Sequence, residues 1–227
     1  MSWWGSGSCI FYRKTYLMAT PILPFNGGPI GSVPALIDYL ALLSSCEFSK
    51  ELREHLLSIV CRKSVKKLGY LLEEGKVSRH IYFIGRGILR CFYRNGDGQE
   101  VTAWILREPN VVVAVNSFYR QQPSFEIIQA VVDTDVFYIS HSELENIYVR
   151  FPEFERVGRL LTIEYLIFWS MQLFSLRMRK KGDRFEMWYK ENEDLLQWVP
   201  QNFVASYLDM EPETFSRLKN AFIGRAK

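Results

Sequence analysis

The first regular hydrophobic pattern in the chain is helical and lies between residues 35 and 62. Leucine and isoleucine recur there at spacings of three and four, which places each set on one face of a helix. The two sets are Leu36, Leu40 and Leu43, and then Leu52, Leu56, Ile59 and Val60. Ser49 stands directly before the second set and predicts its N-terminal cap. The segment therefore predicts two short helices.

From residue 66 to residue 140 the pattern changes to short runs of β-branched and aromatic residues, which are typical of strands. The runs are 80–84, 88–93, 101–106, 111–115, 127–132 and 136–139. Turn residues separate them, and the Asn95-Gly96-Asp97-Gly98 segment is a strong hairpin signal. Six or more short strands at this spacing predict an antiparallel β-roll.

Residues 152–179 form the longest helical pattern. Mostly apolar positions recur at alternating spacings of four and three, as in a heptad repeat. They are Val157, Leu161, Glu164, Phe168, Met171, Ser175 and Met178, with Leu160, Ile167 and Phe174 beside them. So broad a stripe must be buried, either on the roll of the same chain or on the same helix of a second copy. The two alternatives are compatible, because opposite edges of the stripe can serve both contacts.

The last part of the chain predicts a charged hinge at 177–182, a helix at 183–191 and a pair of short helices at 199–208 and 212–223. Asp209, Met210 and Glu211 form the turn of the pair, and Pro212 suits a first helical turn, where its missing N–H costs nothing. Ala205 is small enough to let the two helices cross closely. This is the spacing of a helix-turn-helix.

A helix-turn-helix places its second helix in the major groove of DNA. Arg217 could bind a guanine edge with two hydrogen bonds, and Glu213 could accept one from cytosine. The candidate DNA-contacting residues are Gln201, Asn202, Glu213, Thr214, Arg217 and Lys219. The alternative is a helical hairpin with a solvated charged face. The tail 217–227, which has four basic residues and no acidic one, could contact phosphates or remain solvated.

Composition narrows the function classes only slightly. The 227 residues include 28 Lys and Arg against 25 Asp and Glu, so the net charge of +3 is no strong nucleic-acid signal by itself. No apolar stretch is long enough to predict a membrane span or a secretory signal, so we expect a cytoplasmic protein that does not contact a membrane. Residues 1–34 hold five of the 14 glycines and four of the nine prolines and predict a flexible leader. The sequence from Met18 resembles the start of a protein more than the sequence from Met1 does, so residues 1–17 could be an upstream extension.

The sequence gives little indication of a catalytic or metal-binding site. None of the four cysteines lies in a CxxC spacing, and the three histidines form no HxH pair, so we expect no metal site and no cofactor. A Gly-rich phosphate loop, a Ser-His-Asp pattern and a Cys-His pair are also missing from the sequence. We therefore expect no catalytic residues and no enzyme, although rolls of this kind resemble cupins.

Residues 199–218, VPQNFVASYLDMEPETFSRL, resemble the helix-turn-helix of the CRP/FNR family of bacterial transcription regulators. Glu213, Thr214 and Arg217 match the E-T-x-x-R core of that family's recognition helix. The roll resembles the family's cyclic-nucleotide-binding sensor domain through LLEEG at 71–75, IYFI at 81–84 and DGQEVT at 97–102. The short segments at 117–118, 122–124 and 128–130 resemble the branch found in Bacteroidetes-type bacteria.

The resemblance covers roughly residues 35–222 and implies an α+β chain with a jelly-roll sensor. After the leader expected at 1–34, it implies a sensor domain at 35–150, a dimerisation helix at 151–180 and a helix-turn-helix domain at 181–227. The expected assembly is a homodimer on a palindromic operator in double-stranded DNA, with RNA polymerase and an unknown small-molecule effector as further partners.

Departures from the family pattern qualify this picture. Members that bind cyclic AMP carry a Gly-Glu pair and, further along, an Arg that neutralises the cyclic phosphate, whereas this chain has Ala114 or a neighbour and Ser124 there. A buried anion without a cationic partner is costly, so we expect no tight binding of cyclic AMP or cyclic GMP. Another small ligand could bind near Asn116, Ser117, Gln122 and Ser124. Asp209 replaces the usual turn glycine, so a sensor or scaffold module that has lost DNA binding remains the alternative.

Overall fold

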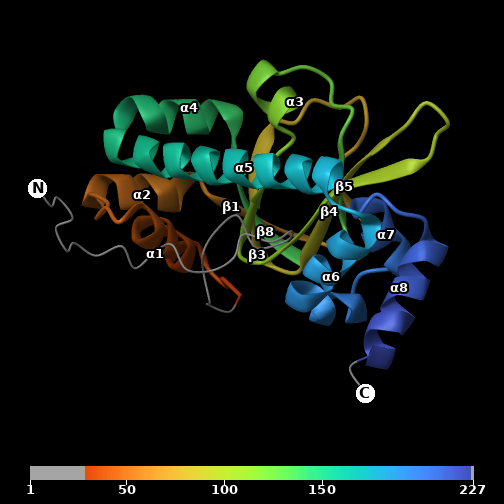
Figure 1. The fold of residues 1–227 in the computed structure, drawn as a ribbon. Coiled ribbons are helices and arrows are strands. Elements are labelled where there is room, and N and C mark those ends of the chain that lie inside the picture. Colours follow the sequence, from red (N-terminus) through yellow and green to blue (C-terminus); the bar gives the residue numbers. More distant parts are fainter. Residues whose placement is uncertain (1–28, 226–227) are drawn as a thin grey trace, which may run out of the picture.

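The computed structural model of the chain describes residues 29–225, which form eight strands, eight α-helices and one 3-10 helix. Figure 1 shows their arrangement. The helices are α1 (Val33–Ser44), α2 (Lys50–Ile59), α3 (Val115–Arg120), α4 (His141–Arg150), α5 (Pro152–Met178), α6 (Lys181–Asn192), η1 (Glu193–Gln197), α7 (Gln201–Tyr207) and α8 (Pro212–Arg225). The strands are β1 (Cys61–Val65), β2 (Tyr70–Leu72), β3 (His80–Arg86), β4 (Ile88–Arg94), β5 (Glu100–Arg107), β6 (Asn110–Val112), β7 (Ile127–Ala130) and β8 (Thr134–Ser140). The predicted α+β class, antiparallel roll, long helix and C-terminal helices are confirmed. None of the helices within 29–225 has the length and hydropathy of a membrane span.

Two four-stranded antiparallel sheets form the roll, with the strand orders β1-β8-β3-β6 and β2-β7-β4-β5. The predicted hairpin joins β4 to β5, where the Gly98 amide donates to the Asn95 carbonyl at 2.9 Å and Gly98 has a φ of 78°. That backbone conformation strains any residue with a side chain, so glycine suits the position. The inner faces of the two sheets share a buried core that includes Ile84, Leu89 and Ile128.

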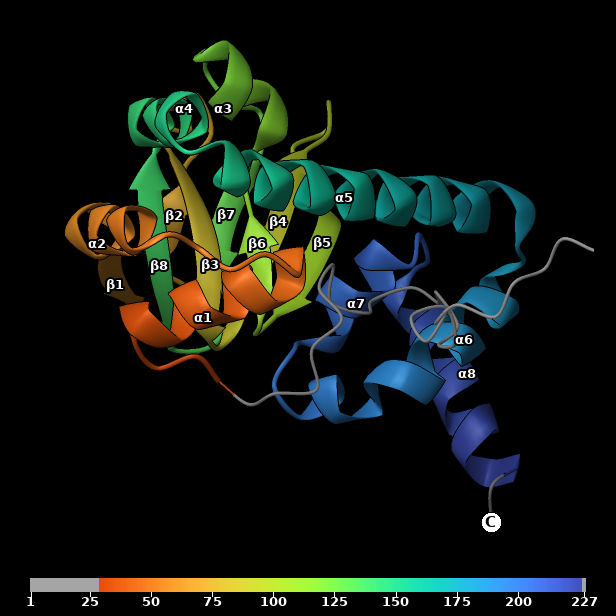
Figure 2. The same cartoon turned by 90° about the vertical axis from the view of Figure 1, so that its left-hand side faces the viewer.

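Helices cover the outer face of the first sheet. Buried residues of α1, α2, α4 and the first half of α5 pack together there with Phe137 and Ile139 of β8. The second half of α5 extends past the roll, and α6, α7 and α8 lie beneath it (Figure 2). We call the unit formed by α6–α8 the reader, and the two sheets the roll.

Helix α5 presents two faces. The predicted heptad positions Val157, Phe168 and Ser175 are buried against the chain's own roll and reader, at 1%, 9% and 2% exposure. These residues are therefore not free to pair with a second copy. An apolar stripe remains exposed on the other side, formed by Ile163, Leu166 and Leu173 together with Phe174 from the edge of the predicted stripe. The structure thus shows which side of α5 the chain's own roll and reader cover and which side stays exposed.

Several predicted elements need correction. The strand predicted at 111–115 ends at Val112, and Val115 begins α3, because Phe118 of that helix is fully buried and Ser117 bonds to the backbone of Ser78. Helix α4 was not predicted, although Ser140 and Glu143 form a capping box at its start. Strand β1 begins at Cys61, inside the segment expected to be helical.

The start of the described chain is ordered where a leader was expected. Residues 1–28 lie outside the described residues, but Ile30 is buried and its amide donates to the Gly85 carbonyl at 2.7 Å. Helix α1 begins at Val33, inside the expected leader, and Ser32 caps it. The predicted cap of the next helix is confirmed, since the Ser49 hydroxyl accepts from the Leu52 amide at 3.2 Å.

Candidate nucleic-acid interface

Helices α7 and α8 form the predicted pair, and Asp209 shapes the turn between them. Asp209 has a φ of 53°, the left-handed conformation that Gly adopts without strain and Asp better than most other residues. The turn closes through the Met210 amide, which donates to the carbonyl of fully buried Ala205 at 3.0 Å. The helices therefore cross closely at the small residue that the sequence placed there.

One face of α8 is fixed by packing. Phe215 is fully buried, with ring centroids 5.3 Å from Phe185 and 6.4 Å from Trp188 of α6. Phe222 on the same face lies 5.1 Å from Tyr189 by ring centroids. Since this face is anchored to α6, the opposite face of α8 is held toward solvent.

The solvent face of α8 holds Glu213, Ser216, Arg217 and Asn220, all exposed. Their spacings of three and four align them on one side of the helix. Thr214 and Lys219 are half-buried at the flanks of this face. Ser216 was missed by the sequence analysis, although its spacing between Glu213 and Asn220 could have revealed it.

Gln201 and Asn202 are exposed at the start of α7. The basic hinge lies close to α8, since a Cβ on Gly182 would be 3.9 Å from Leu218. Lys180 and Lys181 in this hinge are exposed and were not among the predicted DNA contacts. Helix α8 continues to Arg225, so most of the expected tail is helical, and residues 226–227 lie outside the described range.

Buried Arg184, at the start of α6, connects the helix-turn-helix to the end of α5. Its Nε donates to the Leu208 carbonyl at 2.9 Å, and its Nη2 donates to the Asp209 carbonyl at 2.9 Å. Its Nη1 donates to the Arg179 carbonyl at 3.0 Å and to the Leu176 carbonyl at 3.4 Å. One guanidinium thus binds both the turn of the reader and the end of the long helix.

The reader also packs on the roll. Helix α7 covers β5, an edge strand of its sheet, and the Thr102 amide donates to the Ser206 hydroxyl at 2.9 Å. Arg107 of β5 forms an ion pair with Asp194 of η1. An edge strand has unpaired backbone groups, so its cover by α7 satisfies one of them and holds the reader in place.

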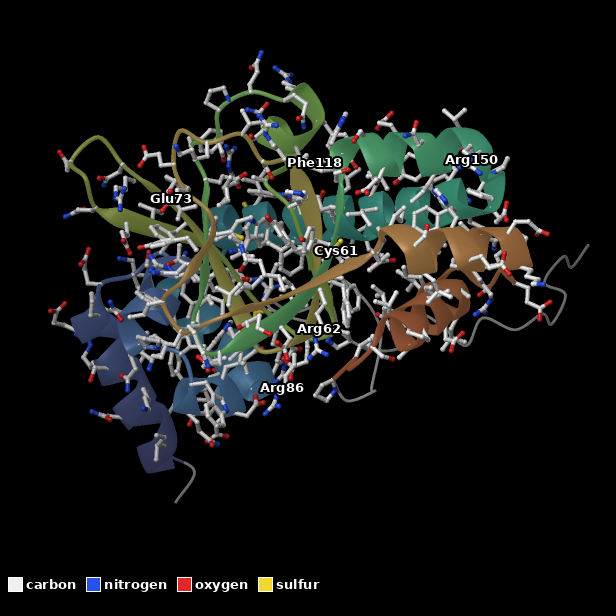
Figure 3. The ribbon with its side chains drawn as sticks, turned by 180° about the vertical axis from the view of Figure 1, so that it is seen from behind. Cys61, Arg62, Glu73, Arg86, Phe118 and Arg150 are labelled. Atoms are coloured by element: carbon white, nitrogen blue, oxygen red, sulfur yellow. The ribbon has the colours of Figure 1, made fainter. Side chains whose placement is uncertain are left out.

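The structure brings two of the candidate ligand-binding residues together, since the Ser117 hydroxyl donates to the Gln122 carbonyl. The Ser117 hydroxyl accepts from the Ser78 amide at 2.9 Å, and the Ser124 hydroxyl bonds both backbone groups of Glu126, so both hydroxyls serve the local backbone. Asn116 and Gln122 are exposed. Their segment lies near Phe118, at the end of the roll away from Arg86 (Figure 3).

Aromatic side chains fill the region between the roll and α5. Trp104 of β5 is 4% exposed and lies 4.9 Å from Phe168 and 4.5 Å from Trp169 by ring centroids. Glu126 lies close enough to contribute to the raised pKa values of Cys91 and Tyr165, which burial raises most. Burial also raises the pKa of Glu126 itself. This region thus combines bulky rings with an acidic group.

Comparison with known proteins agrees with this architecture. Residues 62–151 match the model of the cyclic nucleotide-binding domain. The sequence has no significant match among curated proteins. Three similar solved structures are FixK2 from Bradyrhizobium japonicum, the c-di-GMP responsive global regulator CLP from Xanthomonas campestris, and a protein from Eubacterium rectale described as a transcriptional regulator of the CRP/FNR family.

The three structures share the fold at low sequence identity. FixK2 is 16% identical with a TM-score of 0.64, over 74% of this chain and 86% of its own. CLP is 13% identical with a TM-score of 0.61, over 78% and 93%. The Eubacterium rectale protein is 15% identical with a TM-score of 0.62, over 78% and 85%.

Proposed function

We propose that this chain, which carries a cyclic nucleotide-binding domain and has the fold of the CRP/FNR transcription regulators, is a sequence-specific DNA-binding transcription regulator. The exposed face of α8 is the observation that carries the proposal, because its side chains are free while Phe215 anchors the opposite face. In this proposal Arg217 and Glu213 contact base edges, and Gln201, Asn202, Thr214 and Lys219 contact phosphates. The base-reading and phosphate-binding roles give distinct mutational outcomes.

Selection of duplexes from a random pool with the full-length protein, followed by fluorescence anisotropy on the selected duplex, tests the proposal. We expect specific binding that weakens steeply with salt. Arg217→Ala should remove the sequence preference, whereas Lys219→Ala should weaken binding to all duplexes alike. Arg120→Ala, an exposed arginine on α3, is the matched control and should leave both unchanged. A protein that selects no sequence, or a preference unchanged in Arg217→Ala, would contradict these roles.

The functional unit in this proposal is a homodimer joined along α5. Ile163, Leu166 and Leu173 of the exposed stripe follow a heptad spacing, Phe174 adjoins them, and the four are 41–65% exposed in the single chain. Exposed apolar stripes of this kind mark interaction sites. Two copies paired along α5 would present two α8 helices, which suits a palindromic operator.

Signal transmission in this proposal runs through α5 and Arg184. A change in the roll that shifts α5 would move the carbonyls of Leu176 and Arg179. Both accept hydrogen bonds from the Arg184 guanidinium, which also donates to the carbonyls of Leu208 and Asp209 in the reader. The response is then a population shift between two arrangements of the reader. RNA polymerase is the further partner expected of a regulator on DNA.

Cyclic AMP is not the effector in this proposal. Ser124 is committed to the backbone of Glu126, and Glu126 places a carboxyl group near the interior of the roll. A cyclic phosphate beside Ser124 would therefore lie near this acid, which is unfavourable. Calorimetry of the full-length protein with cyclic AMP and cyclic GMP should show no binding, and micromolar affinity for either would overturn this part of the proposal.

A further inference from the structure

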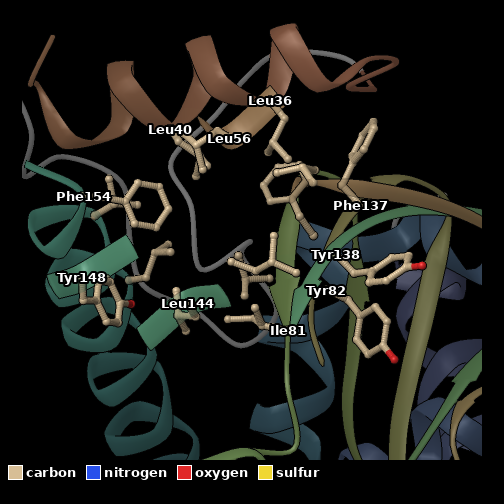
Figure 4. A pocket seen from close by; sticks show the side chains of 17 residues that line it. Leu36, Leu40, Leu56, Ile81, Tyr82, Phe137, Tyr138, Leu144, Tyr148 and Phe154 are labelled. Atoms are coloured by element: carbon tan, nitrogen blue, oxygen red, sulfur yellow. The ribbon is translucent and has the colours of Figure 1, made fainter. Parts of the chain in front are cut away.

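A hollow lies on the outer face of the first sheet, away from the interior of the roll. It is lined by α1, α2, α4, α5, β3, β6 and β8, and its volume is about 80 Å³. Figure 4 shows Leu36 and Leu40 reaching it from α1, Leu144 and Tyr148 from α4, and Ile81 from β3. A second hollow of about 90 Å³ adjoins it. The two share Ile81, Val111, Tyr148, Gly158 and Leu161.

Gly158 leaves space that the Tyr148 hydroxyl occupies where the two hollows adjoin. A Cβ at this position would lie 2.2 Å from the Tyr148 hydroxyl, so any larger residue on α5 would displace the Tyr148 ring. The side chains around the first hollow are almost entirely hydrocarbon and aromatic. Apolar cavities of about 150 Å³ bind benzene-sized molecules, so a ligand with one aromatic ring would need the space of both hollows.

Tyr148 supplies the polar group of the site. Of the three tyrosines at the first hollow, Tyr82 donates to the Leu71 carbonyl at 3.3 Å, and Tyr138 shares a hydrogen bond with the Cys61 thiol. Within residues 29–225 the Tyr148 hydroxyl has no hydrogen-bond partner. Burial raises its pKa, so the hydroxyl keeps its proton and can donate. A ligand acceptor would satisfy it.

We propose that these two adjoining hollows together bind a small apolar molecule of about one aromatic ring that carries a single hydrogen-bond acceptor, held by the Tyr148 hydroxyl. The interior of the roll is filled by Trp104 and Phe168, which makes the outer face of the sheet the better place for such a ligand. Gly158 and Leu161 line the site from α5, the helix whose opposite side carries the exposed apolar stripe. A ligand bound in the hollows would therefore contact α5 directly.

Calorimetry of the full-length protein with acetophenone and with ethylbenzene, which has a similar size and no acceptor, tests the site. We expect acetophenone to bind more tightly, by roughly fivefold for one hydrogen bond. Tyr148→Phe should reduce acetophenone to the affinity of ethylbenzene and leave ethylbenzene unchanged. Absence of binding of both compounds up to their solubility limits, or a Tyr148→Phe variant that keeps the difference, would overturn the proposal.

Substitutions at two neighbouring valines can show whether the ligand binds on the outer face of the sheet or inside the roll. Val111 lines both hollows, whereas Val112 on the same strand belongs to the interior core of the roll. Val111→Ile should therefore weaken acetophenone several-fold and Val112→Ile should not, while Leu161→Phe, which fills both hollows, should weaken it roughly tenfold. Greater weakening by Val112→Ile than by Val111→Ile would place the ligand inside the roll and overturn the proposal. If Leu161→Phe does not fold, the comparison of Val111→Ile with Val112→Ile still tests the site, because these substitutions are smaller.

Ligand binding at this site does not depend on the proposed function, so the two proposals can fail separately. Acetophenone binding by a protein that selects no DNA sequence would contradict the proposed function and support the site. Specific DNA binding by a protein that binds neither acetophenone nor ethylbenzene would support the proposed function and contradict the ligand site.

Discussion

The guanidinium of Arg90 in the roll is stacked on the ring of Phe203 in the reader, with 3.7 Å between Cζ and the ring centroid. Phe92 packs on the guanidinium at 3.9 Å. Arg90 is 1% exposed, its Nε donates to Thr102 at 3.0 Å, and its Nη2 forms an ion pair with Glu100 at 2.7 Å. A buried cation held in this way joins β4 and β5 of the roll to α7.

The Arg90–Phe203 contact predicts an energetic coupling between roll and reader. A double-mutant cycle with Arg90→Met and Phe203→Leu should give a coupling of about 1–2 kcal/mol in the free energy of unfolding, because each substitution keeps apolar volume and removes the cation–π contact. Urea unfolding measures it. Phe125→Leu, at a ring that is 56% exposed, is the control and should show no coupling to Arg90→Met. A coupling near zero for Arg90 and Phe203 would mean that the two only lie side by side.

Arg184 predicts a large loss of stability in the reader. Arg184→Leu removes the donors for the carbonyls of Leu208, Asp209 and Arg179, which should lower the free energy of unfolding by about 3 kcal/mol. Arg184→Lys should lose less, because it keeps one donor group. Urea unfolding followed by tryptophan fluorescence gives both values. Arg120→Leu is the exposed control, and a loss for Arg184→Leu no greater than that of the control would refute the role.

The apolar stripe of α5 predicts a dimer that one charge can break. Leu166 is 65% exposed, and Leu166→Glu in two copies would bury two carboxylates in the paired stripe. Sedimentation velocity should show a dimer for the wild type and a monomer for Leu166→Glu. Val149→Glu, at an α4 position that is 84% exposed, should remain dimeric. A monomeric wild type, or a dimeric Leu166→Glu, would exclude this interface.

Glu191 predicts a pH dependence of stability. Burial raises its pKa from 4.5 to about 7, and within the described residues its Oε2 has no hydrogen-bond partner. The folded state therefore holds this proton at a pH where the unfolded chain has released it. The resulting contribution to stability is fully present below about pH 4.5 and is lost as the pH rises toward 7.

Glu191→Gln should remove this dependence, because glutamine does not titrate. Urea midpoints measured from pH 5 to pH 8 should fall less steeply for Glu191→Gln than for the wild type. Glu51→Gln, at an exposed carboxylate on α2, should follow the wild-type curve. Parallel curves for Glu191→Gln and the wild type would show that Glu191 does not titrate in this range.

Local signals in the sequence predicted most of the secondary structure. Helical spacing predicted α1, α2, α5 and the α7–α8 pair, and the Asn95–Gly98 turn predicted the β4–β5 hairpin, because each depends on residues a few positions apart. The exposed residues of α8 followed from the same spacing once Phe215 was taken as its buried side. Ser140 with Glu143 was an equally local signal for α4 that went unused.

The sequence by itself therefore determined the α+β class, the roll, the long helix and the helix-turn-helix. Only the tertiary structure decided which face of α5 is covered, where Val115–Arg120 turns into a helix, and how the reader rests on the roll. The contact of Ser206 with Thr102 joins residues 104 positions apart, and that of Arg184 with Leu208 joins residues 24 apart. Hydrophobic periodicity shows that a face must be buried but not what buries it, because burial depends on elements brought together by the whole fold.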